Sequence, residues 1–232
     1  MYVLRVELKM KTFIGRKTEL RKLHDLRVSF RQKGLVNLVV IKGRRRIGKS
    51  RLAEEFAKGQ KFLLFTGIAP TEKVTAQDQR ETFARQFCQH FGLPPLQFTD
   101  WNDALYHLAH HLTDEPTVLL FDEISWMSSQ DPTFIPKIKA WWDLMMQNRS
   151  NLTLIFCGSV STWIEENIIN STSFFGRISL IIDLGCLSLS ECAEFLRIIG
   201  FKGSAYDIYK LLSVTGGVPR YLIVTGKHWE TS

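Results

Sequence analysis

The residues best suited to chemistry in this chain form a glycine-rich segment that ends in a lysine and a serine. Residues 43–50 read Gly-Arg-Arg-Arg-Ile-Gly-Lys-Ser and fit the pattern Gly-x-x-x-x-Gly-Lys-Ser/Thr at every position. An apolar run, 35–42, precedes them, and a helical pattern begins at Lys49. In such a turn, glycines let backbone N–H groups curl around a phosphate, and the helix N-terminus adds positive potential. The segment therefore predicts a cradle for nucleotide phosphates, and its strand and helix context disfavours a chance glycine-rich turn.

Two residues of this segment have side chains with separate expected roles. Lys49 is expected to bridge the β- and γ-phosphates of ATP and to take part in catalysis, and the Ser50 hydroxyl is expected to bind Mg²⁺. The bound ATP or ADP is expected to contact the whole segment, which consists of Gly43, Arg44, Arg45, Arg46, Ile47, Gly48, Lys49, Ser50 and Arg51.

A second candidate site is a pair of acids at the end of another apolar run. Residues 117–123 read Thr-Val-Leu-Leu-Phe-Asp-Glu, which is typical of a buried strand that ends in Asp122 and Glu123. An unpaired carboxylate beside a core is costly, so these acids should face a charged partner. We expect Asp122 to hold Mg²⁺ and Glu123 to orient and polarise the water that attacks the γ-phosphate. Acids that only end a strand or cap a helix are the alternative, and the phosphate-binding pattern disfavours it.

The elements that must position these residues alternate along the chain. Five apolar runs are expected to be strands, and helical patterns separate them: 35–42, 61–66, 117–122, 152–157 and 178–184. Such alternation is typical of an α/β fold with a parallel sheet covered on both faces. From Ser188 onward the pattern is helical only, with a capping box between Ser188 and Glu191 and a helix stop at Gly216.

The composition is that of an ordinary globular protein. The chain has 232 residues, of which 45% are hydrophobic and 23% charged, so it can bury a core without a disulfide. No apolar run approaches the ~20 residues of a membrane span, and charges near the N-terminus argue against a secretory signal. We therefore expect a cytoplasmic protein with no membrane partner. The four cysteines lack Cys-x-x-Cys spacing and are expected to be buried, reduced thiols: Cys88, Cys157, Cys186 and Cys192.

The charge is unevenly distributed along the chain. The net charge is +7, but residues 1–60 hold 17 lysines and arginines against five acids. Such a basic segment suggests a polyanionic partner. Arg44, Arg45, Arg46 and Arg51 could form a nucleic-acid patch, although their place in and beside the phosphate-binding segment makes a nucleotide the simpler partner.

With these motifs in place, the chain resembles the archaeal-type ATPases, a prokaryotic P-loop family of the AAA+/STAND group. Residues 43–50 are similar to the family's P-loop, and Asp122 and Glu123 match its Walker B acids. Residues 13–20, Phe-Ile-Gly-Arg-Lys-Thr-Glu-Leu, look like the N-terminal box that packs near the adenine. This resemblance implies nucleotide contacts from Phe13, Ile14, Gly15 and Arg16.

Three further segments of the chain resemble motifs of the same family. Residues 157–161 look like the sensor 1 segment, which would place Ser159 or Ser161 near the γ-phosphate, and we take Ser159 as the catalytic candidate. Residues 174–177 resemble the Gly-Arg motif before the fifth strand, where related ATPases carry an arginine finger, here Arg177. Residues 216–222 are similar to the Gly-x-Pro signature of the helical lid, which implies a nucleotide contact from Pro219.

The resemblance covers about residues 11–224 and implies a particular architecture. We expect a three-layer αβα P-loop NTPase with a five-stranded parallel sheet in the order 5-1-4-3-2 and a partial helical lid. Residues 1–12 would be an N-terminal extension or an edge strand, and Met1 or Met10 could be the natural start. Residues 13–186 would be the ATPase core and 187–232 the lid, without the C-terminal domains that family members usually carry.

The expected function is Mg²⁺-dependent binding and hydrolysis of ATP. The position of Arg177 before an edge strand implies a possible homo-oligomer, in which this arginine reaches a neighbouring subunit. Two other functions stay open at this point: a nucleotide-dependent signalling switch that holds ADP and scarcely turns over, and a nucleic-acid-binding module.

Overall fold

The computed structural model describes residues 13–33 and 36–228. The extension or edge strand expected at 1–12 lies outside the described residues. A single parallel sheet contains β1 (Asn37–Lys42), β2 (Lys61–Thr66), β3 (Thr117–Asp122), β4 (Leu152–Gly158) and β5 (Leu180–Asp183). Its order is β2-β3-β4-β1-β5, which confirms the predicted order 5-1-4-3-2. The predicted runs at 61–66, 117–122 and 152–157 are strands as expected. The predicted run at 178–184 corresponds to β5, which is shorter.

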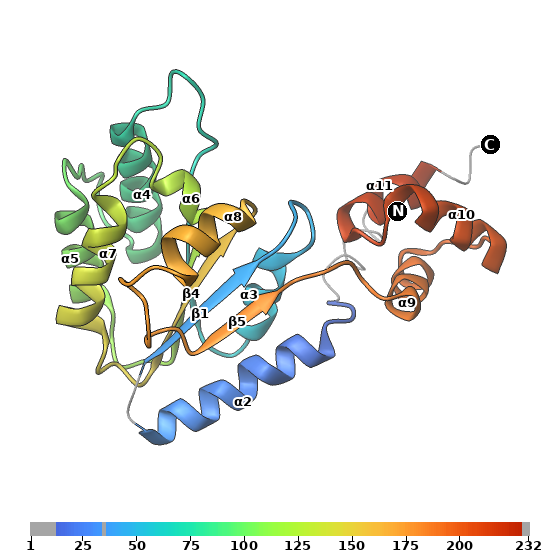
Figure 1. Cartoon of the computed structure of the whole chain (residues 1–232), viewed down its shortest axis with the longest axis horizontal. Helices are drawn as coiled ribbons and strands as arrows, with labels where there is room; N and C mark the ends of the chain where they lie inside the picture. The colour runs from blue at the N-terminus through green and yellow to red at the C-terminus, as the bar shows by residue number, and fades with distance from the viewer. Residues whose placement is uncertain (1–12, 34–35, 229–232) are drawn as a thin grey trace.

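Helices cover both faces of this sheet, as Figure 1 shows. On one face lie α4 (Ala76–Phe91), α5 (Trp101–His111) and α7 (Phe134–Trp141), and on the other lie α2 (Lys17–Lys33) and α3 (Lys49–Phe56). Short helical turns α6 (Ile124–Met127) and α8 (Ser161–Ile164) follow β3 and β4, and the π-helical turns η1 (Trp142–Met146) and η2 (Glu165–Ile169) extend α7 and α8. The expected three-layer αβα arrangement is confirmed.

The core divides into two apolar clusters because side chains alternate along each strand. In β1, Leu38 and Val40 join the cluster under α4 and α5, whereas Val39 and Ile41 join the cluster under α2 and α3. Burial on both faces explains why β1, β3 and β4 are almost continuously apolar. Because these three central strands are parallel, their carboxyl ends meet at one rim of the sheet.

The last three helices form a separate group at one end of the molecule (Figure 1). These are α9 (Leu189–Ile199), α10 (Ala205–Thr215) and α11 (Pro219–His228), and we call them the lid helices. They have an apolar cluster of their own, made of Leu187, Cys192, Leu196, Leu211 and Leu222. The capping box between Ser188 and Glu191 is present at the start of α9, and α10 ends at Gly216, as the sequence predicts.

Two findings concern the expected cysteines and membrane spans. Cys88, Cys157 and Cys192 are buried as expected, but the prediction was wrong for Cys186, which is exposed because it lies in the linker between β5 and the lid helices. Within the described residues, the structure contains no helix with the length and apolar character needed to cross a membrane.

Candidate functional site

The phosphate-binding segment follows β1 and leads directly into α3. Its first and last glycines have left-handed backbones, with φ of 146° at Gly43 and 100° at Gly48. A Cβ atom on Gly43 would lie 2.5 Å from the carbonyl oxygen of Leu184, in the segment that follows β5. Glycine is required at the first position both by backbone conformation and by close packing against its neighbour. The loop thus has the shape that its sequence predicts.

Lys49 lies inside this loop rather than on its outer surface. The residue is only 5% exposed, and its Nζ donates hydrogen bonds to the carbonyl oxygens of Gly43 at 2.9 Å and Arg44 at 3.1 Å. A buried ammonium group is stable only with such partners. The loop therefore holds a positive charge at the place where the sequence predicts phosphate binding.

The two predicted metal ligands are in direct contact. Ser50 Oγ donates to Asp122 Oδ2 at 2.5 Å, and the backbone N–H of Glu123 donates to Asp122 Oδ1 at 3.1 Å. Burial raises the pKa of Asp122, with a smaller contribution in the same direction from the negative charge of Glu123. A hydroxyl and a partly desolvated carboxylate form the kind of oxygen donor set that Mg²⁺ prefers.

Glu123 lies beside Ser159 because β3 and β4 are neighbours and end at the same rim. Glu123 Oε2 accepts hydrogen bonds from the backbone N–H of Ser159 at 3.1 Å and from its Oγ at 2.9 Å. Glu123 has φ 49°, a left-handed conformation that is uncommon for glutamate and typical of functional turns. Of the two serines that the sequence left open, Ser159 contacts Glu123, whereas Ser161 begins α8.

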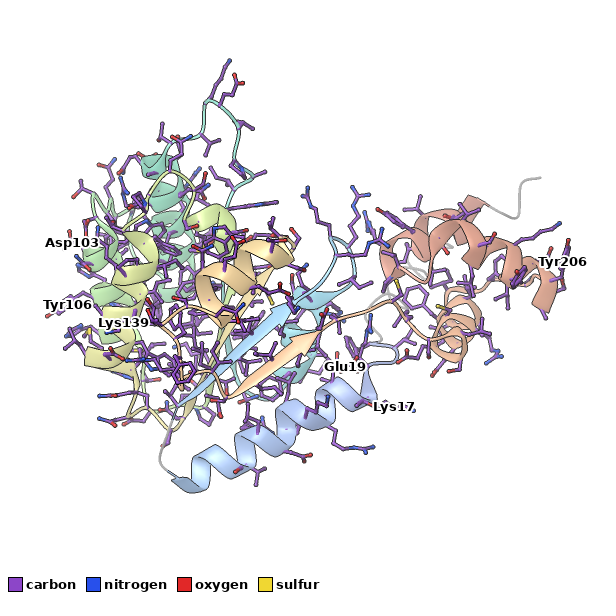
Figure 2. The ribbon with its side chains drawn as sticks, in the orientation of Figure 1. Lys17, Glu19, Asp103, Tyr106, Lys139 and Tyr206 are labelled. Atoms are coloured by element: carbon purple, nitrogen blue, oxygen red, sulfur yellow. The ribbon has the colours of Figure 1, made fainter. Side chains whose placement is uncertain are left out.

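The N-terminal box packs against the loop and the lid linker through Arg16. This residue is buried, and its Nη2 donates to the carbonyl oxygens of Gly185 at 2.6 Å and Ile47 at 3.5 Å. An ion pair of 3.6 Å joins Arg16 to Glu19 in the first turn of α2, whose position Figure 2 labels. The box is therefore joined to the P-loop through Arg16.

A cavity of about 460 Å³ opens between the N-terminal box, the P-loop and the lid helices. Eleven of the residues predicted from the sequence line it: Phe13, Ile14, Arg16, Arg46, Ile47, Gly48, Lys49, Ser50, Arg51, Glu123 and Pro219. Asp122 and Ser159 reach it through their contacts with Ser50 and Glu123. Of the remaining predicted residues, Gly15, Gly43, Arg44, Arg45 and Arg177 are not part of its lining.

The cavity is also lined by residues of the linker and the lid helices that the sequence did not suggest as site residues. Leu187, Phe195, Ile199, Arg220 and Ile223 line the side opposite the P-loop. Phe195 and Ile199 lie one helical turn apart in α9, and that spacing alone does not distinguish a cavity wall from a packed core. Arg220 directly follows Pro219 in the lid signature, so it was the one residue that the sequence could have suggested.

The arginines of the loop are held by aromatic side chains from two other elements. Arg45 lies over the ring of Trp126 at 5.0 Å, and Arg46 lies over the ring of Tyr221 at 5.8 Å. Arg51 forms an ion pair of 2.5 Å with Glu54 within α3. The contact with Tyr221 connects the loop to the lid helix α11.

Arg177 is not brought to the cavity of its own chain. It precedes β5 at the amino end of the sheet, where the backbone N–H of Ser179 bonds to the carbonyl oxygen of Leu38. The P-loop begins five residues further along β1, a separation of roughly 17 Å at ~3.3 Å per residue. Arg177 instead forms a two-pronged ion pair with Asp143, with distances of 2.9 Å (Nε–Oδ1) and 3.1 Å (Nη2–Oδ2).

The parallel sheet, the glycine-rich loop and the adjoining acids define a P-loop nucleotide-binding protein. Residues 33–162 match a family model described as the AAA domain, and the chain belongs to this family. The predicted AAA module is thereby confirmed, and this family supports a nucleotide-binding, ATPase-like function.

Solved structures of archaeal proteins share the fold. A Walker-type ATPase of Pyrococcus abyssi has a TM-score of 0.63 and 18% identity, with 92% of this chain and 67% of that chain covered. The ORC2 protein of Aeropyrum pernix, solved in ADPNP–ADP complexes, has a TM-score of 0.61 and 15% identity, with 90% and 60% covered. An uncharacterised protein of Methanocaldococcus jannaschii is 21% identical over 212 residues, which are 90% of this chain and 43% of that protein. The chain thus spans less than half of this curated relative.

Proposed function

We propose that the chain binds ATP together with Mg²⁺ and hydrolyses it to ADP and phosphate. The observation that carries the proposal is the 2.5 Å contact between Ser50 and Asp122 beside the buried Lys49. It joins the phosphate loop and the acidic strand end, which are 72 positions apart in the sequence, in one site.

The donor set of the site fits Mg²⁺. Ser50 and Asp122 would hold the ion, with Asp122 acting directly or through water. When bound, Mg²⁺ neutralises charge on the phosphates and favours departure of ADP. The raised pKa of Asp122 fits this role, because a desolvated carboxylate gains more from a cation than a solvated one.

Three residues of the chain would then have separate roles in hydrolysis. Lys49 exchanges its two loop carbonyl partners for β- and γ-phosphate oxygens, which need a positive charge more than neutral carbonyls do. Glu123 orients the attacking water and accepts its proton. Ser159 restrains one oxygen of Glu123, which leaves Oε1 to serve the water.

The other end of the cavity suits a nucleoside. Phe13, Ile14, Leu187, Phe195 and Ile223 provide apolar surface that a flat base can contact. Their distribution over the N-terminal box and the lid helices supports binding of the base between them, with Pro219 at the start of α11.

Arg177 would act on a neighbouring copy of the chain. It precedes β5, an edge strand of the sheet, and two apolar side chains near it in the sequence are open to solvent: Phe175 is 82% and Ile181 is 44% exposed. Exposed apolar residues of this kind are typical of a contact surface. An arginine finger supplied from a partner can be worth a factor of ~10³ or more in rate.

A nucleotide-dependent switch with little turnover is the second candidate. The ion pair between Arg177 and Asp143 favours it, because an arginine held there contributes nothing to hydrolysis. A nucleic-acid partner for the exposed arginines Arg44 and Arg45 stays a prediction. A DNA mobility shift that weakens with salt and disappears on charge reversal of these residues would test it.

Replacement of Lys49 tests the proposed function. Lys49→Ala should weaken Mg-ATP binding at least tenfold and abolish steady-state turnover, as measured with a fluorescent nucleotide and by phosphate release. Lys58→Ala, an exposed lysine after the end of α3, is the matched control and should behave like the wild type. Nucleotide binding without turnover in the wild type would favour the switch. Unchanged binding and turnover in Lys49→Ala would contradict the assignment of the site.

A further inference from the structure

Glu191 connects the lid helices to the N-terminal box. Its Oε1 accepts a hydrogen bond of 2.7 Å from the backbone N–H of Arg16, which is 175 positions away in the sequence. Its other oxygen, Oε2, accepts from the backbone N–H and the Oγ of Ser188, each at 2.9 Å, and so caps α9. One carboxylate therefore performs two tasks at the same time.

A comparison with the other capping boxes of the described helices shows that the contact with Arg16, and not the cap itself, is the unusual feature of Glu191. In α4, Asp78 Oδ2 accepts from both the N–H and the Oγ of Thr75, and in α10 Asp207 Oδ2 does the same with Ser204. In each case a single oxygen makes both bonds within the cap. An aspartate at this position is therefore sufficient to cap a helix, and the longer glutamate in α9 is needed for the reach to Arg16.

The N-terminal box is shaped to receive this carboxylate. A Cβ atom on Gly15 would lie 2.5 Å from Glu191 Oε1, and Gly15 has φ 73°, which favours glycine. Arg16 follows with φ 57°, an uncommon conformation for arginine. Two consecutive left-handed residues turn the N–H of Arg16 toward α9 while its guanidinium reaches Gly185 and Ile47.

The charge of Glu191 is suited to this contact. Burial raises the pKa of Glu191, but hydrogen bonds from the backbones of Ser188 and Arg16 outweigh it, so the pKa lies below its usual range. The carboxylate is ionised at neutral pH. Hydrogen bonds from N–H groups to a charged acceptor are stronger than those between neutral groups.

From these contacts, we propose that Glu191 is a positioning residue for nucleotide binding, because it fixes the lid wall of the cavity against the N-terminal box. This inference rests on the proposed function, since it assigns the cavity to a nucleotide. Phe13, Ile14 and Arg16 line the cavity from the N-terminal box, while Phe195 and Ile199 line it from the same helix that Glu191 caps. The distance between these walls, and hence the fit of a base, depends on the contact between Glu191 and Arg16.

Shortening the side chain separates positioning from capping. Glu191→Asp keeps a cap of the kind that Asp78 and Asp207 make but cannot reach Arg16. We expect it to weaken binding of Mg-ATP and Mg-ADP about tenfold, while turnover at saturating ATP changes less than threefold. The thermal midpoint should fall by no more than about 2 °C. Asp207→Glu, the reverse exchange in a cap away from the cavity, is the matched control and should bind like the wild type.

A second pair of variants tests the contact itself. Glu191→Gln keeps the length and one carbonyl oxygen for Arg16 but turns its NH2 group toward the N–H of Ser188, so it should retain most of the affinity while it weakens the cap of α9. Gly15→Ala forces a Cβ onto the same oxygen, and adding Glu191→Asp to it should weaken binding no further, because both changes break one contact. Equal affinity of Glu191→Asp and wild type would overturn the inference and leave the proposed function intact. A larger loss of affinity in Glu191→Gln than in Glu191→Asp, with a matching fall of the thermal midpoint, would reduce Glu191 to a helix cap and also overturn the inference. A wild type that binds no nucleotide would overturn both.

Discussion

Replacing Asp143 by asparagine is expected to increase ATP hydrolysis by concentrated protein, because Asp143 holds Arg177, the arginine that on the proposed function acts on a neighbouring copy. The Arg177 guanidinium donates hydrogen bonds to both carboxylate oxygens of Asp143, and Lys139 Nζ makes a third contact at 2.9 Å to Oδ2 of the same carboxylate. Hydrogen bonding from Arg177, aided by Lys139, holds the pKa of Asp143 below its usual range. The aspartate is therefore charged at neutral pH, and the pair competes directly with any role of Arg177 in a partner's site.

The cost of releasing Arg177 can be worked out from this geometry. The side chains of Arg177 and Asp143 are 29% and 28% exposed. Ion pairs near the surface contribute ~0.2–1 kcal/mol, and Lys139 continues to neutralise Asp143 after Arg177 leaves. Release should thus cost about 0.5–1 kcal/mol, a factor of ~2–5 in the population of free arginine at 1.4 kcal/mol per tenfold. We expect Asp143→Asn to raise specific activity by this factor and Arg177→Ala to lower it by ~10³.

The assay is phosphate release over a range of protein concentrations. Specific activity of the wild type should rise with concentration, and Arg177→Ala should bind ATP normally but lose that rise. Mixing Arg177→Ala with Lys49→Ala should restore activity, because one variant supplies an intact loop and the other an intact arginine. Asp103→Asn, the same exchange at an exposed acid of α5 that Figure 2 labels, should have no effect. Strict proportionality of rate to concentration, no rescue on mixing and no gain in Asp143→Asn would reduce Arg177 to a surface ion pair.

Two further predictions concern the acids at the end of β3. Glu123→Gln should bind ATP with wild-type affinity and retain it after gel filtration, with turnover at least 100-fold lower; undiminished turnover would mean that another residue positions the water. Asp122→Asn should abolish the Mg²⁺ dependence of binding. Because burial raises its pKa, the charged Asp122 costs folding stability as the pH rises through that raised value. Without nucleotide at neutral or higher pH, the asparagine variant should therefore match or exceed the wild type in urea denaturation, and a clear loss would refute this reasoning.

The sequence predicts the sheet well, because its three central strands are buried on both faces and all five strands are short runs of mainly apolar residues. The runs at 61–66 and 117–122 match β2 and β3, since each has four consecutive apolar residues between polar ends. The run at 178–184 was predicted too long: β5 comprises the four residues Leu180–Asp183, the ones paired with β1. The strand order came from the resemblance, and the pairing of the strands confirms it.

The sequence predicts the site only where function follows from local spacing. The P-loop and the two acids are recognisable because their chemistry needs particular residues side by side in the chain. Two contacts depend instead on how separate elements pack: Glu191 with Arg16, 175 positions apart, and Arg177 with Asp143, 34 positions apart. A local sequence pattern does not predict such packing. The division between core and lid after residue 186, the cytoplasmic location and the roles of the site residues stay predictions.

The two ends of the cavity would report different properties of a bound nucleotide. Lys49, Glu123 and Ser159 lie at the sheet rim, where the presence of a γ-phosphate would be felt. Arg16 joins the P-loop carbonyl of Ile47, the linker carbonyl of Gly185 and the lid carboxylate of Glu191 at the opposite end, where a base would lie. On the proposed function, occupancy by either ADP or ATP fixes the lid helices and brings a β-phosphate to Lys49, whereas only the γ-phosphate of ATP reaches Glu123 and Ser159. Lid position should therefore be set mainly by occupancy with either nucleotide. Any further change that the γ-phosphate of ATP adds should depend on the contact of Arg46 in the loop with Tyr221 in α11.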